Sequence, residues 1–319
     1  MKRIGVLTSG GDAPGMNAAI RAAVRTGLSM GMEVYGIERG YEGLLEGNLK
    51  KMDRRSVGDI LQRGGTILRT ARSSRFMTDE GQRHAAGILE TFGIEGLVVI
   101  GGDGSFRGAL DLDRRGIRVM GVPGTIDNDL AYTDYTIGFD TAVNTVLSMI
   151  SNLRDTASAH ERTTIIEVMG RKCGDIALHS GLAGGADVIL VPEMDLDINM
   201  VCRKVLRGQQ IGKLHSIIIK AEGVEISSQQ LAQIVEERTG REVRAVVPGH
   251  IQRGGTPTGR DRIMASIMAS KAVQLLFDDE RSKAVGICNS EIVAYDLEEA
   301  LKVEREFEER LYRIAETLA

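Results

Sequence analysis

The length, composition and charge of the chain favour a globular protein of two domains and exclude several classes of function. It has 319 residues, 42% hydrophobic and 26% charged, which is more chain than one hydrophobic core usually serves. A net charge of −4, no Trp and 4% aromatic residues argue against a nucleic-acid partner. Three scattered cysteines show neither a disulfide framework nor metal spacing, and no apolar run is long enough for a membrane span or signal peptide. We therefore expect a cytoplasmic protein with no membrane partner.

The first half of the chain alternates short apolar runs with helical patterns. The runs are nearly continuous and rich in β-branched residues, as expected for strands buried on both faces. Strands are predicted near residues 2–7, 33–37, 96–100 and 118–122. After the first strand, Ile20, Val24 and Leu28 recur every four residues and predict a helix.

The second half repeats the same pattern. A long helix with an apolar stripe from Val143 to Leu153 is predicted to end near Arg154. Strands follow near residues 163–168, 187–191, 215–219 and 243–247, and the chain from Thr258 onward is predicted to be mainly helical. Strand, glycine turn and helix in repetition are typical of βαβ units. We therefore predict an α/β fold of two doubly wound, mainly parallel-sheet (Rossmann-like) domains, with the active site in the cleft between them.

Two glycine turns fit anion-binding sites. "SGGDAPGMN" (9–17) and "GGDGSFRG" (101–108) each follow a predicted strand and open a helix, whose first N–H groups have no helical partner. Neither matches the P-loop or the dinucleotide signature. Asp103 lies inside the second turn, where a carboxylate repels phosphates unless a cation bridges them. It either caps the following helix or holds Mg²⁺ beside a nucleotide.

A third turn, "GTIDND", follows the strand predicted to end near residue 122. Asp127 and Asp129 there are either ordinary turn residues or groups that hold a metal or accept a proton. Five arginines lie beside strand ends or glycine turns, where the planar guanidinium suits a phosphate, although each alone is also readable as a surface charge. They are Arg72, Arg162, Arg171, Arg244 and Arg253. Among the histidines, only His250 is placed in a site.

Six motifs of the sequence resemble those of a known family. "TSGGDAPGMNAAIR", "GGDGS", "PGTIDND", "EVMGR", "AEGV" and "GHIQRGG" occur in the order and at the spacing found in bacterial ATP-dependent 6-phosphofructokinases, over essentially the whole chain. The resemblance implies transfer of the γ-phosphoryl group of ATP to the 1-hydroxyl of fructose 6-phosphate with Mg²⁺, in a homotetramer. It also implies a larger ATP-binding domain of residues 1–138 plus about 251–301. The smaller domain, for fructose 6-phosphate, comprises residues 139–250 plus about 302–319.

The resemblance also implies a role for individual residues. Asp127 is the expected base, Asp103 the metal residue, and Arg162 and Arg244 are expected to reach the sugar phosphate from a neighbouring subunit. The remaining expected catalytic residues are Gly11, Arg72, Thr125, Asp129 and Arg171. The expected nucleotide residues are Gly11, Tyr41, Arg72, Ser73, Phe76, Gly102, Asp103, Gly104, Ser105 and Gly108. The expected sugar-phosphate residues are Thr125, Asp127, Arg162, Met169, Gly170, Arg171, Glu222, Arg244, His250 and Arg253.

Two glycines bear on the phosphoryl donor. Pyrophosphate-dependent relatives typically carry Asp at the position of Gly104 and Lys at that of Gly124, where these side chains would take the space of ATP. The glycines favour ATP over pyrophosphate, and the base, metal aspartate and arginines together favour an enzyme over a nucleotide sensor of the same fold. Met77 lacks the basic charge frequent at its position, which leaves donor breadth open.

An effector site for ADP or phosphoenolpyruvate is also implied. Its expected residues are Arg21, Arg25, Arg54, Asp59, Arg154, Asp187 and Lys213. Arg21 and Arg25 lie one helical turn apart and are equally readable as a solvated face. Asp187 stands where Glu is usual and Ile211 where Arg is common, so we expect a weakened or altered effector response.

Overall fold

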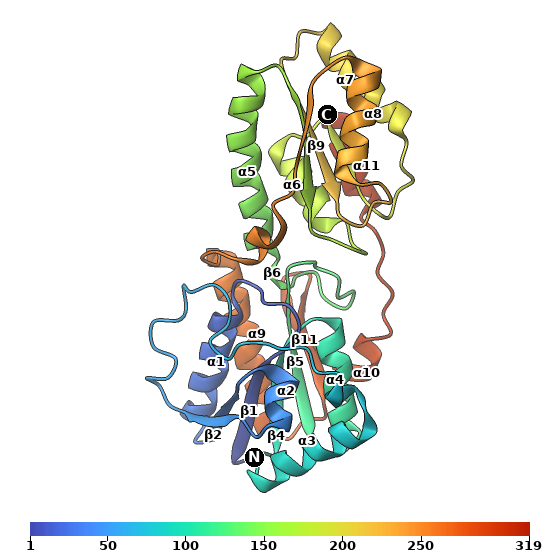
Figure 1. Ribbon diagram of the computed structural model, residues 1–319. Helices are drawn as coiled ribbons and strands as arrows, with labels where there is room; N and C mark the ends of the chain where they lie inside the picture. The colour runs from blue at the N-terminus through green and yellow to red at the C-terminus, as the bar shows by residue number, and fades with distance from the viewer. The chain divides into compact units, whose positions relative to one another are not determined.

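The computed structural model describes residues 1–319, which divide into two compact units (Figure 1). Unit 1 comprises Met1–Thr141 and Arg253–Arg305, and unit 2 comprises Ala142–Gln252 and Glu306–Ala319. These limits lie close to the predicted domain boundaries. Which ligand each unit binds stays a prediction at this point.

Unit 1 is built on an eight-stranded sheet. Its strand order is β12-β11-β5-β4-β1-β2-β3, with β6 paired to β5, and its centre is parallel while the pairs β2–β3 and β11–β12 are antiparallel. The strands are β1 (Arg3–Thr8), β2 (Glu33–Ile37), β3 (Leu49–Met52), β4 (Gly96–Gly101), β5 (Arg118–Thr125), β6 (Ile137–Gly138), β11 (Lys283–Cys288) and β12 (Glu291–Asp296). The helices are α1 (Met16–Ser29), α2 (Gly40–Leu45), α3 (Asp79–Thr91), α4 (Asp103–Asp113), α9 (Gly259–Phe277), α10 (Leu297–Ala300) and the 3₁₀ turn η1 (Arg75–Met77).

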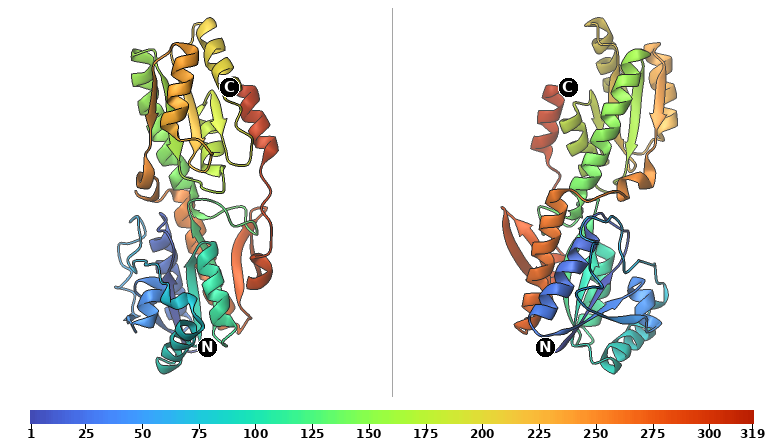
Figure 2. Two further views of the ribbon diagram at one scale, coloured as in Figure 1. Left: turned by 45° about the vertical axis from the view of Figure 1, so that its right-hand side comes forward. Right: turned by 90° about the vertical axis from the view of Figure 1, so that its left-hand side faces the viewer.

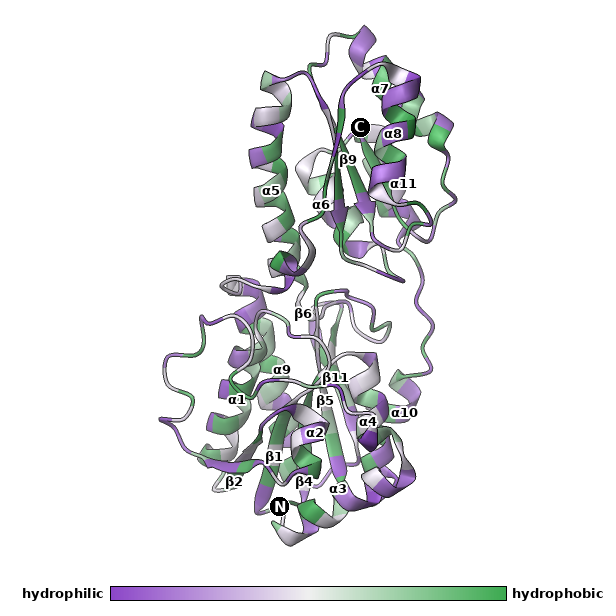
Figure 3. Ribbon diagram, in the orientation of Figure 1, coloured by the Kyte–Doolittle hydropathy of each residue, from purple (hydrophilic) through white to green (hydrophobic).

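Alternation along the central strands gives this sheet two apolar faces. Leu7, Leu97 and Val119 join a core cluster with residues of α2, α3 and α4, whereas the residues next to them in the sequence point to the opposite side. That side is covered by α1 and α9, which contact each other and lie side by side in both views of Figure 2. Strands covered on both faces explain the continuous apolar runs in the sequence, and Figure 3 shows β1 and β4 as largely hydrophobic.

Unit 2 is built on a four-stranded parallel sheet of order β10-β7-β9-β8. The strands are β7 (Thr163–Val168), β8 (Val188–Leu190), β9 (Ser216–Ala221) and β10 (Val243–Val246). The helices are α5 (Phe139–Ala159, which begins in unit 1), α6 (Asp175–Gly184), α7 (Ile198–Gln210), α8 (Ser228–Thr239), α11 (Glu309–Leu318) and the 3₁₀ turn η2 (Gly249–Arg253). α8 packs on β7 and β10, while α6 and α11 pack on β8.

The predicted α/β class with mainly parallel sheets is confirmed, and all eight predicted strands are present. The chain after Thr258 is mainly helical as predicted, in α9, α10 and α11, but the prediction missed the hairpin β11–β12, whose turn at Asn289 and Ser290 has positive φ. One boundary was wrong. The long helix α5 continues beyond Arg154 to Ala159, because polar residues at its end prolong the helix without extending its apolar stripe. Strands β3 and β6 were not predicted. None of the helices is long and apolar enough for a membrane span.

A buried carboxylate ties together the polypeptide that follows the "GTIDND" turn. Asp261, at the start of α9, is fully buried and accepts hydrogen bonds from the Tyr135 hydroxyl (2.6 Å) and from the backbone N–H of Gly138 (2.6 Å). The backbone N–H and hydroxyl of Thr141 also donate to it, at 2.9 and 2.5 Å. Four donors on one buried carboxylate therefore hold β6 and the start of α5 against α9.

Removing this carboxylate should destabilise unit 1. We expect Asp261→Ala to lower the free energy of unfolding by about 3–5 kcal/mol, because four buried hydrogen bonds lose their acceptor. Urea unfolding followed by circular dichroism measures this loss. The matched control is Asp278→Ala, since Asp278 is exposed at the end of α9 and its loss should cost about 0.5 kcal/mol or less. Equal midpoints for the two variants would contradict the role given to Asp261.

Candidate functional site

A cavity of about 720 Å³ in unit 1 collects the residues of the glycine turns. Its size is in the usual range for small-molecule sites. Thirteen residues predicted to bind nucleotide or substrate line it: Gly11, Tyr41, Arg72, Ser73, Phe76, Gly102, Asp103, Gly104, Ser105, Gly108, Thr125, Asp127 and Arg253. The structure thus brings together, in one unit, all ten residues predicted for the nucleotide and the residue predicted to act as base.

One end of the cavity is formed by backbone. β1 and β4 are neighbouring parallel strands, so the turns that follow them meet at the same edge of the sheet. The chain then enters α1 after Gly15 and α4 after Gly102, and neither helix has a side chain capping its first N–H groups. Gly10 and Gly15 have φ of 85° and 109°, a conformation that favours glycine. Uncapped helix N-termini beside glycine turns are thus present where the sequence predicted them, and anion binding by them stays a prediction.

Arg253 lies against this surface. Its Nη1 donates to the backbone carbonyl of Asp12 at 3.3 Å, and a Cβ on Gly11 would lie only 2.4 Å from the same nitrogen. A side chain at position 11 would therefore displace the guanidinium from this position. Arg253 was predicted among the sugar-phosphate residues, and the structure places it beside the glycine turns at Gly11 and Gly102, the end of the cavity predicted to bind phosphate.

The other end is aromatic. The rings of Tyr41 and Phe76 stack at 4.1 Å between centroids with an angle of 10°. The Tyr41 hydroxyl donates to the carbonyl of Ser105 at 2.6 Å, and both rings lie close to Gly108, where an added Cβ would meet them at 2.8 and 3.0 Å. Ser73 hydrogen-bonds Glu42 and accepts from the backbone N–H of Phe76, so it fixes the loop as well as lining the cavity. This end offers a flat apolar wall of fixed shape.

Asp103 does not cap a helix. Gly102 occupies the N-cap, Asp103 is the first residue of α4, and no side-chain cap hydrogen bond is present. The carboxylate instead accepts two hydrogen bonds from the Arg107 guanidinium, at 2.8 and 3.0 Å, one helical turn further on. The capping alternative is therefore wrong. Its side chain keeps 44% exposure and projects at the phosphate-binding end, which leaves it accessible to a cation.

The "GTIDND" turn is held in place by hydrogen bonds. The Thr125 hydroxyl accepts from the Asp127 N–H at 3.2 Å, and the Thr136 hydroxyl donates to the carbonyl of Thr125 at 2.7 Å. Asn128 has φ of 54°, which Asn tolerates well, and its side-chain oxygen accepts from the Thr136 N–H at 3.1 Å. These contacts aim Asp127 into the cavity.

Asp129 differs from Asp127 because it does not line the cavity. Loss of hydration within the turn raises the pKa of Asp129, and the negative charge of Asp103 adds to that rise. The two aspartates of the turn are thus in different environments. The side chain of Asp129 is exposed, so both carboxylates are accessible, but of the two only Asp127 lines the cavity.

Unit 2 brings a second group of predicted residues together. "MGR" and "AEG" follow the parallel strands β7 and β9, and the N–H groups of Glu222 and Gly223 donate to the carbonyls of Val168 and Gly170, at 2.8 and 3.2 Å. The side chain of buried Gln252, in η2, accepts from the Met169 N–H at 3.0 Å. Met169, Gly170, Arg171 and Glu222 therefore meet at the carboxyl edge of this sheet.

Arg162 and Arg244 lie at the other side of the same sheet, at the amino-terminal ends of its strands. Arg162 directly precedes β7 and Arg244 lies near the start of β10, so the six residues of β7, about 20 Å of strand, separate Arg162 from Met169. Glu242 bridges the two arginines through an ion pair with each, at 2.5 Å from Arg162, and the two guanidinium groups lower the pKa of Glu242. Within one unit these arginines cannot reach a ligand held by Met169 and Glu222.

The predicted effector residues fall into two sets. Arg21, Arg25, Arg54 and Asp59 belong to unit 1. In unit 2, Arg154 donates to the carbonyls of Gly184 and Gly185, while Asp187 pairs with Lys213 and accepts from the Ile217 N–H at 2.8 Å. Asp187 is thus already engaged within the unit, and Ile211 is 75% exposed.

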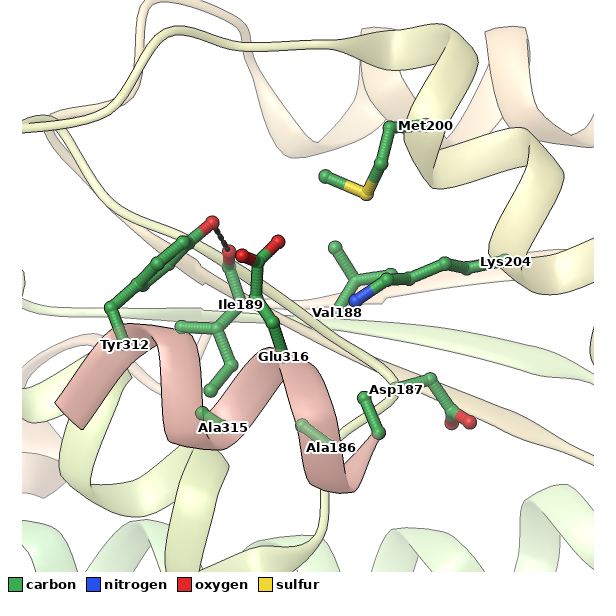
Figure 4. A pocket seen from close by; sticks show the side chains of 10 residues that line it. Ala186, Asp187, Val188, Ile189, Met200, Lys204, Tyr312, Ala315 and Glu316 are labelled. Atoms are coloured by element: carbon green, nitrogen blue, oxygen red, sulfur yellow. Dashed lines mark hydrogen bonds between the residues drawn. The ribbon is translucent and has the colours of Figure 1, made fainter. Parts of the chain in front are cut away.

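A much smaller cavity of about 10 Å³ lies between α11 and β8 in unit 2 (Figure 4). Lys204, Asp187 and Glu316 line it, and the Tyr312 hydroxyl donates to the carbonyl of Ile189 at 3.2 Å. A cavity of this volume holds about one water molecule. It is therefore no site for a nucleotide or a sugar phosphate.

Sequence reasoning missed two charged residues of the large cavity. Arg107 and Asp111 lie four and eight residues after Asp103 on α4 and line the cavity with it. Their spacing of four residues could have indicated them, because residues spaced by four on a helix share a face. That spacing pointed to the cavity only once α4 was known to border it along its length.

Comparison with known proteins decides the family. The sequence pattern described as Phosphofructokinase matches residues 3–276, most of the chain. The chain belongs to the phosphofructokinase family. Residues outside that match include α10 and α11, which complete units 1 and 2.

Within the phosphofructokinase family, the curated relatives match over full length. The chain is 60% identical to the "ATP-dependent 6-phosphofructokinase" of Clostridium tetani and 59% identical to that of Clostridium botulinum (strain Loch Maree / Type A3), over 100% of both chains in each case. Among solved structures, the phosphofructokinase of Saccharomyces cerevisiae aligns with a TM-score of 0.89 and 37% identity, covering 95% of this chain and 45% of that one. A pyrophosphate-dependent phosphofructokinase from Marinobacter aquaeolei (TM-score 0.86, 23% identity, 96% and 86% coverage) shares the fold.

The contact between Gly11 and Arg253 yields a prediction. Gly11→Ala should displace the guanidinium, the flexible end of a side chain, while leaving the fold intact. We expect the affinity for ATP to fall about 10-fold, because a charged hydrogen bond to phosphate is worth about 1.5–3 kcal/mol. Isothermal titration calorimetry measures it. Gly87→Ala is the matched control, since its Cβ would meet open space on α3. Equal affinities for ATP in the two variants would refute the role of Gly11.

Proposed function

We propose that the protein phosphorylates fructose 6-phosphate at its 1-hydroxyl with ATP, giving fructose 1,6-bisphosphate and ADP, the committed step of glycolysis. The observation that carries this proposal is that one cavity contains both glycine turns, Asp103 and Asp127. An anion-binding surface, a residue for a metal and a proton acceptor are the parts that phosphoryl transfer to an alcohol requires. The names of the full-length relatives support the same reaction.

Different residues of unit 1 would bind the donor, stabilise the transferring group and accept the proton. Backbone N–H groups after Gly10 and Gly102 bind the phosphates of the donor, and Arg72 and Arg253 place positive charge where the transferring oxygens develop negative charge. Asp127 accepts the proton of the attacking hydroxyl, a role that needs only hydrogen-bond reach in the bound complex. Thr125 holds the backbone of Asp127 in place.

Asp103 fits a magnesium ion held jointly with the nucleotide. No group of three or more His, Cys, Asp or Glu side chains forms a protein cage, and Mg²⁺ typically takes one or two carboxylates together with phosphate oxygens and water. When bound, the ion would neutralise charge on the phosphates. Arg107, which pairs with Asp103, keeps that carboxylate at the mouth of the phosphate-binding end.

The surroundings of two glycines bear on the choice of ATP as donor. A Cβ on Gly104 would meet nothing within 4 Å, so an Asp there would extend into open space beside the phosphates. Gly124 differs, because its Cβ would lie 3.1–3.4 Å from Ile100, Met16 and Gly101. Packing alone therefore gives a reason for Gly124, and the case for ATP depends mainly on Gly104.

The sugar phosphate is assigned to residues of unit 2 and to a second copy of the chain. Met169, Gly170, Arg171, Glu222 and His250 would bind one sugar phosphate. Arg162 and Arg244 lie at the other edge of their sheet, which supports their serving a site on a neighbouring subunit. We accordingly propose a homotetramer that acts in the cytoplasm, with ADP or phosphoenolpyruvate as effector and a response altered by Asp187 and Ile211.

The role of Asp127 can be tested by substitution. Asp127→Ser should lower kcat by about 10²–10⁴, the range for loss of a positioned base, with little change in the KM for ATP. A coupled assay with fructose 6-phosphate and MgATP measures both. Asp278→Ser, outside the cavity, should match the wild type. Near-normal turnover of Asp127→Ser would remove Asp127 from the proposed role.

The donor can be tested at Gly104. We expect the wild type to turn over with ATP and not with pyrophosphate. Gly104→Asp should lower kcat/KM for ATP about 100-fold, because a carboxylate beside the phosphates costs several kcal/mol. Gly104→Ala adds only a methyl group in open space and should stay within about 3-fold of the wild type. Efficient turnover of the wild type with pyrophosphate would overturn the assignment of ATP.

A further inference from the structure

Asp111 extends the ligand-facing side of α4 beyond the phosphate-binding end. Asp103, Arg107 and Asp111 are spaced by four residues, and all three line the 720 Å³ cavity. Eight residues of helix separate Asp103 from Asp111, which is about 12 Å along the axis. A ligand with its phosphates at the start of α4 and its remainder along this face would reach Asp111 with its far end.

The far end of the cavity has the character of a nucleobase pocket. Tyr41, Phe76 and Gly108 form its flat wall, and Met77, 82% exposed, lies at its rim. The aromatic pair gives this wall its shape but offers the ligand little hydrogen bonding, because the Tyr41 hydroxyl is already engaged with the carbonyl of Ser105. Polar recognition of a base therefore depends on the other groups at this end.

Among the other polar groups at this end, one charged side chain is a candidate for hydrogen bonding to a base. Ser73 is engaged with Glu42, and Arg107 with Asp103, while Ser74 offers only a neutral hydroxyl at the exposed surface. Asp111 is the carboxylate at this end. Its acceptor oxygens make it complementary to N–H groups of a base and repulsive toward carbonyl oxygens.

Asp111 is held in a defined orientation. Its Oδ2 accepts a hydrogen bond of 2.8 Å from Nε2 of Gln82, a residue of α3 that is only 8% exposed. Its Oδ1 lies 3.8 Å from Nη1 of Arg114, which is an ion-pair contact beyond hydrogen-bond distance. The side chain is 33% exposed. One oxygen is thus fixed by the protein, and the other can accept a hydrogen bond from a ligand.

We propose that Asp111 determines base specificity, by accepting a hydrogen bond from the exocyclic amino group of adenine. This inference rests on the proposed function in one respect, that the cavity binds a nucleoside triphosphate. A donor with a carbonyl oxygen in place of that amine would face the carboxylate with lone pairs only. A site that hydrogen-bonds one group of a base disfavours the analogue that lacks that group, because the half-buried acceptor would then face a carbonyl oxygen in place of a donor.

A purely structural role for Asp111 predicts something different. If its only task were to tie α4 to α3 through Gln82, a replacement that keeps an acceptor for Gln82 would change nothing at the ligand. Asp111→Asn is such a replacement, since its amide oxygen can accept from Gln82 while its NH₂ group turns the free position from acceptor to donor.

The experiment is equilibrium binding of MgATP and of magnesium inosine triphosphate, which carries a carbonyl at the position of the amine. Isothermal titration calorimetry on the full chain should give the wild type a preference for ATP of about 10-fold or more. Asp111→Asn should bind ATP about 10-fold more weakly and lose or reverse the preference. Met77→Ala, at the apolar rim, is the matched control and should change both affinities by the same factor. Thermal unfolding verifies that the variants are folded.

Each result decides the proposal. Equal affinities of the wild type for the two nucleotides, an unchanged preference in Asp111→Asn, or no binding of either nucleotide would overturn it. Nucleotide binding is measured without the sugar and without turnover. A failure of the proposed reaction can therefore be distinguished from a failure of the role proposed for Asp111. The expected preference without phosphorylation of fructose 6-phosphate would uphold Asp111 and refute the proposed function.

Discussion

The first N–H groups of α4 are the constraint around which unit 1 is organised. They have no partner within the helix, and Gly102 supplies no side chain to satisfy them, so they are available to an anion. The parallel pairing of β1 and β4 brings the turn of Gly10 and Gly11 to the same edge. The next strand along, β5, delivers Thr125 and Asp127 there as well. Three consecutive strands of the sheet therefore determine which side chains can meet one polyanion.

Charge must then be balanced on this surface. Asp103 and Asp127 both face the cavity that would hold phosphates, and an unpaired carboxylate beside a phosphate is unfavourable. Arg107 already neutralises Asp103, and Arg253 lies within reach of the turn only because Gly11 has no side chain. Glycine in this site thus allows neighbouring groups to approach the backbone closely, as well as allowing positive φ. The same face of α4 continues to Asp111, so we propose that one helix provides the anion-binding end, a metal residue and a contact for the far end of the ligand.

Much of the fold could be predicted from the sequence, because strands and glycine turns depend mainly on residues close together in the chain. Nearly continuous β-branched runs predicted eight of the strands, and glycine turns before helices predicted the uncapped N-termini of α1 and α4. The hairpin β11–β12 escaped prediction because its antiparallel pairing is partly exposed, so it lacks the buried run that marked the other strands. The hydrogen bonds of Asp261 were also beyond reach, since its partners lie more than 100 residues away in sequence. For the site, Asp103 could not be assigned until its helix was seen to begin at that residue. Asp111 went unnoticed because its relation to a ligand depends on the packing of α2, α3 and η1 around α4.

We propose that the protein transfers a phosphoryl group from ATP, bound by unit 1, to the 1-hydroxyl of fructose 6-phosphate, bound by residues of unit 2 and of a second copy of the chain. The measurement that tests it most directly is phosphorus NMR of the products formed from MgATP and fructose 6-phosphate. We expect fructose 1,6-bisphosphate and ADP to appear in equal amounts, with no inorganic phosphate. Release of inorganic phosphate without bisphosphate, or a new phosphate ester at another hydroxyl, would contradict it.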